Sequence, residues 1–240
     1  MGAASVEHPS AAGSDLVSNA VGAITEHIRK HELGPGDRLP SEAAFSGALG
    51  VSRTVVREAF RSLAALRLID LHTGKRSTIA PLDYGAIAPL IEHGILTEQI
   101  TVRQIYDVRR TIESRTAALA ALHRSEKEAS SIRSHAQAMS ASINEPDEIM
   151  EHDLALHRDI ARASKNPVFA LLIGAFEGVT RRTWPIGWRS FKSASERSEM
   201  AAIHVELANA VIAGDPLAAS EAVEKHFDFS VRALFDAGIV

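Results

Sequence analysis

Apolar residues recur every three or four positions along most of the chain, which is the spacing of amphipathic helices. In the N-terminal part this pattern predicts three helices. The first covers residues 15–33, the second follows Ser41 and the third follows Ser52, and both serines are good N-caps. Gly50 supplies the permissive backbone that ends the second helix. The two shorter helices are therefore expected to form a helix-turn-helix.

A strand pattern follows these helices. Residues 68–72 and 77–80 are short runs with strand character, and Thr73-Gly74-Lys75-Arg76 between them has the composition of a hairpin turn with a basic tip. A β-hairpin directly after a helix-turn-helix is typical of a wing. The sequence thus predicts a winged helix-turn-helix domain of three helices and a β-hairpin over residues 15–80.

The third helix has two contrasting faces. Arg53, Arg57 and Arg61 recur every four residues on one side, and the apolar side comprises Val55, Val56, Ala59, Phe60 and Leu63. Such a helix can pack on its domain and present planar arginines to guanine edges and phosphates in the major groove. A solvated basic face on an ordinary core helix is the simpler alternative. The neighbouring hairpin and first helix favour DNA binding.

After Ala80 the pattern is helical throughout. A linker is expected over residues 81–100, with a short helix near 84–95. Thr101 and Gln104 form a capping box where the next helix begins. Further helices are expected at 125–143, 146–164, 167–182, 195–213 and 216–236. Prolines stand at the start of three of them, where the first turn tolerates proline. Residues 101–240 are therefore predicted to form an all-α bundle of about six helices. The segment 181–189, which contains both tryptophans, is expected to be a loop.

Composition narrows the class of protein. The chain has 240 residues, of which 45% are hydrophobic, and this is enough for two domains with a core in each. Cysteine is absent, which excludes disulfides and cysteine-based metal sites and suits a reducing cytoplasm. No apolar run approaches the ~20 residues that span a bilayer. Residues 1–14 are small and polar, as in a disordered tail. We expect a cytoplasmic protein without a membrane partner.

The charge is unevenly distributed. The net charge is −4, which is unusual for a protein that binds nucleic acid. Residues 15–80, however, contain nine Lys/Arg and seven Asp/Glu, so they carry +2 and the rest of the chain carries −6. A weakly basic head on an acidic body suits a protein that contacts DNA through one end only.

Several motifs resemble the GntR family of bacterial winged-helix transcription regulators. The matching segments are Gly36-Asp37-Arg38-Leu39-Pro40-Ser41-Glu42 and Gly50-Val51-Ser52-Arg53-Thr54-Val55-Val56-Arg57-Glu58-Ala59, followed by Leu63 and the turn at Gly74. The resemblance implies that Arg38, Arg53 and Arg57 contact double-stranded operator DNA and that the wing tip reaches the neighbouring minor groove. Further candidates for DNA contacts are Ser41, Ser52, Thr54, Gly74, Lys75 and Arg76.

Two positions depart from the usual pattern of this family. Arg67 stands where a glycine commonly precedes the first wing strand, and Arg76 stands where the wing usually has its second glycine. Both changes add positive charge. We therefore expect them to alter the shape and base preference of the wing contact rather than to prevent DNA binding.

Four polar residues lie on predicted inward faces of the C-terminal helices. Asp153 and His157 are four residues apart and share a face. His204 and His226 are equally distant from the turn at Gly214-Asp215-Pro216, so an antiparallel hairpin places both rings at the same height. Three imidazoles and one carboxylate suit Zn²⁺ or Ni²⁺, with positions left open for an exogenous oxygen ligand. The alternative is a set of separate core histidines, each with its own hydrogen-bond partner.

The helical half resembles the FCD-type effector domain of FadR-like GntR regulators. In that domain an Asp-x-x-x-His pair and two later histidines hold a divalent metal, and Asp153, His157, His204 and His226 match in type, order and spacing. The resemblance therefore favours a metal site. We expect the remaining histidines, including His123, His135 and His152, on the surface.

Arg109 lies on the predicted inward edge of its helix, whereas Arg110, Tyr106 and Glu113 group on the other side. An inward arginine needs an anion, which is either the carboxylate of a small ligand or an internal partner such as Asp153 or Glu113. The resemblance implies a small carboxylate or sugar acid as effector, with Arg109 as its anchor. It also points to Asn166, although a helix N-cap explains this residue equally well.

The sequence thus predicts a ligand-responsive transcription regulator rather than an enzyme. We expect a homodimer on a near-palindromic operator, acting as a repressor that a small organic acid releases. One alternative is a metal-independent effector sensor of the same family. The other is a metal-dependent hydrolase, which lacks a clear general base and leaves residues 1–80 without a role.

Overall fold

The computed structural model describes residues 11–239, and their side chains from Asp15 onward. The chain divides into two units, the first ending at Ala86 and the second beginning at Ile87. The expected disordered tail falls largely outside the described residues. Its last part is helical, however, because α1 begins at Ala11 and not at Asp15.

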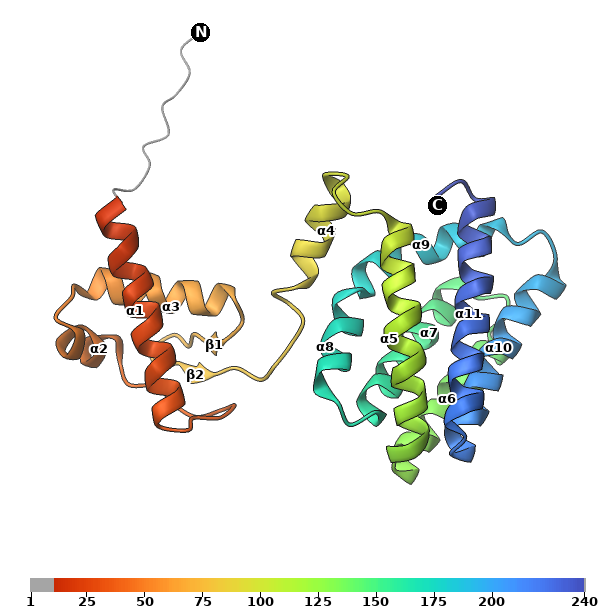
Figure 1. Ribbon diagram of the computed structural model, residues 1–240, viewed down its shortest axis with the longest axis horizontal. Helices are drawn as coiled ribbons and strands as arrows, with labels where there is room; N and C mark the ends of the chain where they lie inside the picture. The colour runs from red at the N-terminus through yellow and green to blue at the C-terminus, as the bar shows by residue number, and fades with distance from the viewer. Residues whose placement is uncertain (1–10, 240) are drawn as a thin grey trace, which may run out of the picture. The chain divides into compact units, whose positions relative to one another are not determined.

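The described residues of the first unit form three helices and a two-stranded sheet, as predicted (Figure 1). The helices are α1 (Ala11–Lys30), α2 (Glu42–Leu49) and α3 (Arg53–Ala65). The strands β1 (Ile69–Asp70) and β2 (Thr78–Ile79) are antiparallel and shorter than expected, with Ile69 paired to Ile79. Ile24, Val56 and Phe60 are buried in the core that joins α1 to α3. This core holds α3 with its other face exposed.

Capping explains the turn between α2 and α3. The Ser41 hydroxyl accepts the backbone N–H of Ala44, and the Ser52 hydroxyl accepts that of Val55. Gly50 has φ +67°, the left-handed conformation that ends a helix most cheaply when the residue has no Cβ. The two N-caps and the αL glycine predicted from the sequence are therefore present.

The second unit is all-helical in the part of the chain that the structure describes. Its elements are α4 (Ala88–Leu96), α5 (Val102–His123), α6 (Glu126–Ala141), α7 (Pro146–Ala163), α8 (Pro167–Ala175), α9 (Glu177–Ser190), α10 (Ala194–Ala213) and α11 (Pro216–Asp236). Figure 1 shows α5 and α11 side by side, and α7 and α10 also contact α5. The capping box of Thr101 and Gln104 is present, and Pro146, Pro167 and Pro216 each begin a helix.

Three sequence expectations about these helices are wrong. The helix expected at 167–182 is divided at Phe176 into α8 and α9, so the bundle after Thr101 has seven helices. Residues 181–189 are not a loop but belong to α9, which continues through Pro185. Trp184 and Trp188 stack with ring centroids 5.0 Å apart and Trp188 is buried, so tertiary packing outweighs the hydrogen bond that proline removes.

The third error concerns faces of helices. Apolar residues at helical spacing predict inward positions for Leu16 of α1 and Val108 of α5, yet 45% and 46% of their surface is exposed. Tyr106 and Glu113 were placed on the outer side of α5, yet both are buried. Several helices cover α5 from different directions, so a single stripe at helical spacing does not describe its buried surface.

Candidate nucleic-acid interface and candidate metal centre

A cationic groove of about 620 Å³ lies between α2, α3 and the wing of the first unit. Five Lys/Arg and a single acidic residue line it. The cations are Arg53, Arg57, Arg61, Lys75 and Arg76, and the acid is Glu42. Arg61 also pairs with Glu58 at 2.8 Å, whereas Arg53 and Arg57 are exposed on the free side of α3. This groove has the charge that attracts a phosphate backbone.

The other predicted DNA-contacting residues lie in or beside this groove. Ser41 and Gly74 line it, and Gly74 has φ +71° at the tip of the wing. Ser52 caps α3, and Thr54 is exposed in the first turn of that helix. Arg38 is exposed on the extended segment that bridges to Thr78 of β2.

The two positions that depart from the family pattern behave differently. Arg76 lines the groove, as expected for an added cation on the wing. Arg67 instead pairs with Asp83 at 3.2 Å, beyond the wing strands, and does not line the groove. Its φ of 59° is the left-handed conformation for which glycine is the usual residue. The charge of Arg67 is therefore directed to Asp83 and not into the groove, and its effect on the wing contact stays a prediction.

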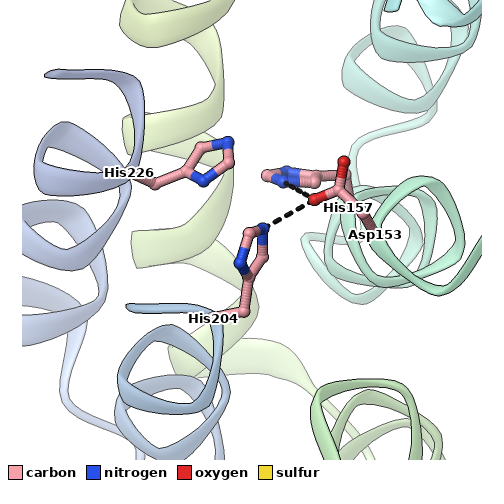
Figure 2. Close-up of side chains that lie close together, drawn as sticks. All are labelled: Asp153, His157, His204 and His226. Atoms are coloured by element: carbon pink, nitrogen blue, oxygen red, sulfur yellow. Dashed lines mark ion pairs between the residues drawn. The ribbon is translucent and has the colours of Figure 1, made fainter. Parts of the chain in front are cut away.

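In the second unit, Asp153, His157, His204 and His226 converge in the interior of the bundle (Figure 2). Asp153 and His157 come from α7, His204 from α10 and His226 from α11. One ligand atom from each residue lies within 4.8 Å of the others, and all four residues are buried. A tetrahedron of ligands with bonds of ~2.1 Å has edges of ~3.4 Å, so the cluster has the dimensions of a single-ion site.

Local structure accounts for the convergence. Asp153 and His157 are on consecutive turns of α7. Gly214, with φ +76°, and the Asp215 N-cap reverse the chain between α10 and α11. The rings of His204 and His226 consequently lie 4.6 Å apart, at the same height, as the sequence spacing predicts.

The unpaired atoms of this cluster test whether a metal fits. Asp153 Oδ1, His157 Nε2, His204 Nε2 and His226 Nδ1 are buried and have no hydrogen bond of acceptable geometry. Asp153 Oδ1 lies 2.6 Å from His204 Nε2 and 3.5 Å from His157 Nε2. Buried polar atoms are normally hydrogen-bonded, so four such atoms facing one another fit a shared cation. The donor set of three imidazoles and one carboxylate fits a borderline divalent cation.

The far nitrogens of two histidines are held by acceptors. His204 Nδ1 donates to the carbonyl of Met200 at 2.8 Å. His157 Nδ1 lies 2.6 Å from Glu113 Oε2. A partner on one ring nitrogen orients the ring and leaves the other nitrogen to the ion. The sequence names Glu113 as a possible partner of Arg109, but its contact with His157 was not predicted, because Glu113 was expected on the outer side of α5.

Protonation states follow from burial and neighbouring charges. Burial raises the pKa of the Asp153 carboxyl, but His204 and His157 lower it more, so this pKa lies well below its usual range. Burial, reinforced by His204 and His157, depresses the pKa of His226 far below its usual value. For His157, Glu113 and Asp153 outweigh burial and raise the pKa to about 9. Near neutral pH, Asp153 is ionised and His226 is neutral, the forms that bind metals, whereas His157 is protonated without an ion and releases a proton when an ion binds.

Arg109 is buried, as predicted, and its anion is Glu113. The Nε atom donates to Glu113 Oε1 at 2.7 Å, and a second guanidinium nitrogen donates to the Thr180 hydroxyl at 2.7 Å. Glu113 thus connects Arg109 to His157. Asn166 is not brought to this network: its side chain caps α8 by accepting the Val168 N–H.

The space beside the cluster is closed. It is too narrow for a water molecule and is lined by Glu113, Thr116, His157, Ile160, Ile173, Leu207 and Val223. In this arrangement of the helices, the described space beside the cluster has no room for a ligand.

The histidines expected on the surface are only partly there. His123 is exposed, whereas His135 and His152 are half-buried and contact each other between α6 and α7. Both face a neighbouring helix, which the pattern of each helix alone does not reveal.

A winged helix-turn-helix with a cationic groove, followed by a helical domain with a buried polar cluster, defines a DNA-binding transcription regulator with an effector domain. Residues 16–79 match the family described as bacterial regulatory proteins, gntR family, and residues 104–229 match the FCD domain. The chain belongs to the GntR family and carries an FCD domain. It is a transcription regulator and not an enzyme.

Relatives and a solved structure are consistent with this assignment. The HTH-type transcriptional regulator LutR of Bacillus subtilis (strain 168) is 29% identical over 207 residues, which cover 83% of this chain and 92% of LutR. The HTH-type transcriptional repressor NanR of Salmonella typhimurium is 26% identical over 221 residues, which cover 89% and 82%. The fold is similar to that of Streptococcus agalactiae GntR, with a TM-score of 0.69, 21% identity and coverage of 90% and 98%. Among the described helices none has the length and apolar character needed to cross a membrane.

Proposed function

We propose that this protein is a cytoplasmic repressor that binds an operator as a homodimer and leaves it when a small organic acid binds the helical domain. The observation that supports this most directly is one chain with both a cationic groove and a buried four-ligand cluster. The relatives that carry the word repressor in their name support the sign of regulation.

The DNA contact is assigned to α3 and the wing. Arg53 and Arg57 are on the exposed face of α3, where their planar guanidinium groups can bind guanine edges or phosphates in the major groove. Lys75 and Arg76 are at the wing, beside the Gly74 turn, and can bind phosphates. Arg38 and Thr54 flank these residues. Ser41 and Ser52 act mainly by fixing the starts of α2 and α3.

A homodimer accounts for the use of a single recognition helix in each chain. Two copies related by a two-fold axis present two α3 helices to successive major-groove segments, about one or two helical turns apart. The partner of this protein is therefore a near-palindromic operator.

The cluster of Asp153, His157, His204 and His226 is assigned to Zn²⁺ or Ni²⁺. When bound, the ion supplies open coordination positions for an oxygen of the effector. Arg109 supplies the second contact, because a buried guanidinium is suited to a carboxylate. In the closed structure, Glu113 accepts a hydrogen bond from Arg109. The effector acid therefore competes with the Glu113 carboxylate for the same arginine. Asn166 remains a candidate only through its place in the family pattern.

Effector binding requires the helices to open, because the described space beside the cluster admits no water. A ligand that binds the open arrangement better than the closed one shifts the population toward it. This shift is the physical basis we propose for release from the operator.

The test uses full-length protein and an operator selected from random DNA fragments. Operator affinity is measured with metal-loaded and chelator-treated protein against a panel of small hydroxy acids, dicarboxylates and sugar acids. We expect at least one acid to weaken operator binding of the metal-loaded protein and to have less effect after chelation. If no acid changes operator affinity in either state, effector release as proposed is wrong.

A metal-independent sensor is the second candidate, and one contact favours it. Asp153 Oδ1 lies 2.6 Å from His204 Nε2, and the pKa of His157 is raised to about 9. A protonated His157 can therefore balance the charge of the Asp153 carboxylate without a metal ion. Elemental analysis of protein purified without chelators separates the two candidates. Less than about one tenth of an equivalent of metal, with acid response intact, favours the metal-independent sensor.

A further inference from the structure

Two histidines outside the buried cluster meet between α6 and α7. The Nδ1 atoms of His135 and His152 lie 3.0 Å apart, and the ring centroids are 5.3 Å apart. The His135 side chain is 22% exposed and His152 is half-buried, so solvent reaches the pair. Neither ring is used by the DNA contact or by the effector site described above.

The separation of the two nitrogens matches that of two ligands on one ion. Nitrogens bound to a divalent metal at about 2.0–2.1 Å are ~2.9–3.4 Å apart for angles between square and tetrahedral geometry. The observed 3.0 Å falls within this range. The spacing of the two nitrogens therefore fits one shared ion, and in the absence of an ion it fits an N–H···N hydrogen bond.

A carboxylate stands behind one of the rings. Asp159 Oδ2 lies 3.6 Å from Nε2 of His135, the nitrogen remote from His152. Ser131 donates to the same carboxylate oxygen at 2.5 Å, and Arg162 lies 3.5 Å from the other. The negative charge of this carboxylate favours a proton on Nε2, which leaves Nδ1 to bind an ion.

We propose that His135 and His152 form a second metal site, for a borderline divalent cation bound by two imidazoles and completed by water, with Asp159 as the outer carboxylate. The ion ties α6 to α7. His152 directly precedes Asp153, so the same turn of α7 contributes to this site and to the buried cluster. The two sites therefore lie on adjacent faces of the same turn of α7.

The test counts bound ions in full-length, metal-stripped protein. Cu²⁺ is the probe, because imidazole sites bind it more tightly than Ni²⁺ or Zn²⁺. We expect His152→Gln to bind one equivalent fewer than the unaltered protein, since the pair His27 and His31 is the same in both. The matched control is His123→Gln, an exposed histidine on α5, which should bind as many ions as the unaltered protein. In the electron paramagnetic resonance spectrum of the unaltered protein, one Cu²⁺ signal should show coupling to two nitrogens. His152→Gln should lack this signal. Asp159→Asn should lower the affinity for the same ion about tenfold.

Three outcomes decide the proposal. If His152→Gln binds as many ions as His123→Gln and the unaltered protein, the two rings share only an N–H···N hydrogen bond and the second site is wrong. If the unaltered protein binds one ion that His152→Gln loses and His204→Ala keeps, the second site stands and the buried metal centre fails. If two ions bind and each variant loses one, both sites stand.

Discussion

Glu113→Gln is the substitution that tests the buried network most severely. Glu113 and Arg109 are ion-paired at 2.7 Å, with only 4% and 5% of their side chains exposed. The amide retains an acceptor for Arg109 Nε but removes the charge that compensates the guanidinium. Removing one partner of a buried pair typically costs about 3–5 kcal/mol, and the retained acceptor places our expectation near ~3 kcal/mol.

The matched control lies on the same helix. Arg110 pairs with Asp228 at 2.6 Å, but their side chains are 41% and 64% exposed. Such an exposed pair contributes between about 0 and 1 kcal/mol, so Asp228→Asn should be nearly silent. Both variants remove a carboxylate charge paired with an arginine of α5, so their contrast reports the burial of Glu113 together with its second contact, to His157.

The assay is urea unfolding of metal-stripped protein at pH 7, followed by far-ultraviolet circular dichroism and by tryptophan fluorescence, since Trp184 and Trp188 report on the helical unit. A double-mutant cycle with Arg109→Met measures the coupling. We expect the double variant to be more stable than the sum of the single effects predicts, by about 1–3 kcal/mol. Equal stabilities for Glu113→Gln and Asp228→Asn, or a coupling near zero, would refute the network.

Three further predictions follow from the contacts. His204→Ala should lower the affinity for Zn²⁺ at the buried cluster at least 100-fold in a chelator competition, whereas Arg133→Ala on α6 should leave it unchanged. Arg67→Gly removes a left-handed backbone strain of about 1–2 kcal/mol. It also removes the ion pair with Asp83 and increases the conformational entropy of the unfolded chain. The free energy of unfolding should therefore change by less than about 1 kcal/mol, and DNA affinity by less than about twofold. The Glu128 carboxylate accepts a hydrogen bond from Lys165 and caps α6, and both contacts lower its pKa to about 2. The contribution of these contacts to stability is therefore present above about pH 4.5 and lost as the pH falls toward 2. Lys165→Met should flatten this part of the pH profile of the unfolding midpoint.

The first unit was predictable because local signals agree. Ser41, Gly50 and Ser52 determine the boundaries of the helix-turn-helix by capping and backbone freedom, and Gly74 determines the turn of the wing. The histidine cluster was also predictable. His204 and His226 are symmetrical about a recognisable turn, so their sequence spacing determines their height in the hairpin.

What the sequence did not reveal depends on contacts between distant helices. Glu113 was placed on the outside of α5 because a single apolar stripe was assumed, whereas several helices bury this element. No proline marks the break between α8 and α9 at Phe176. Pro185, by contrast, lies inside α9, which tertiary packing stabilises. His135 and His152 meet only because α6 and α7 are antiparallel neighbours. These features follow from tertiary packing, which local propensity does not encode.

The salt dependence of operator binding tests the central claim most directly. The logarithm of the association constant is measured against the logarithm of salt concentration for the unaltered protein, for Arg53→Ala/Arg57→Ala and for the control Arg133→Ala. Each lost phosphate contact reduces the slope by about 0.9, so the double variant should lose up to ~2 in slope and bind operator far more weakly, while the control matches the unaltered protein. An unchanged affinity and slope in the double variant would contradict the assignment of α3 as the helix that enters the DNA groove.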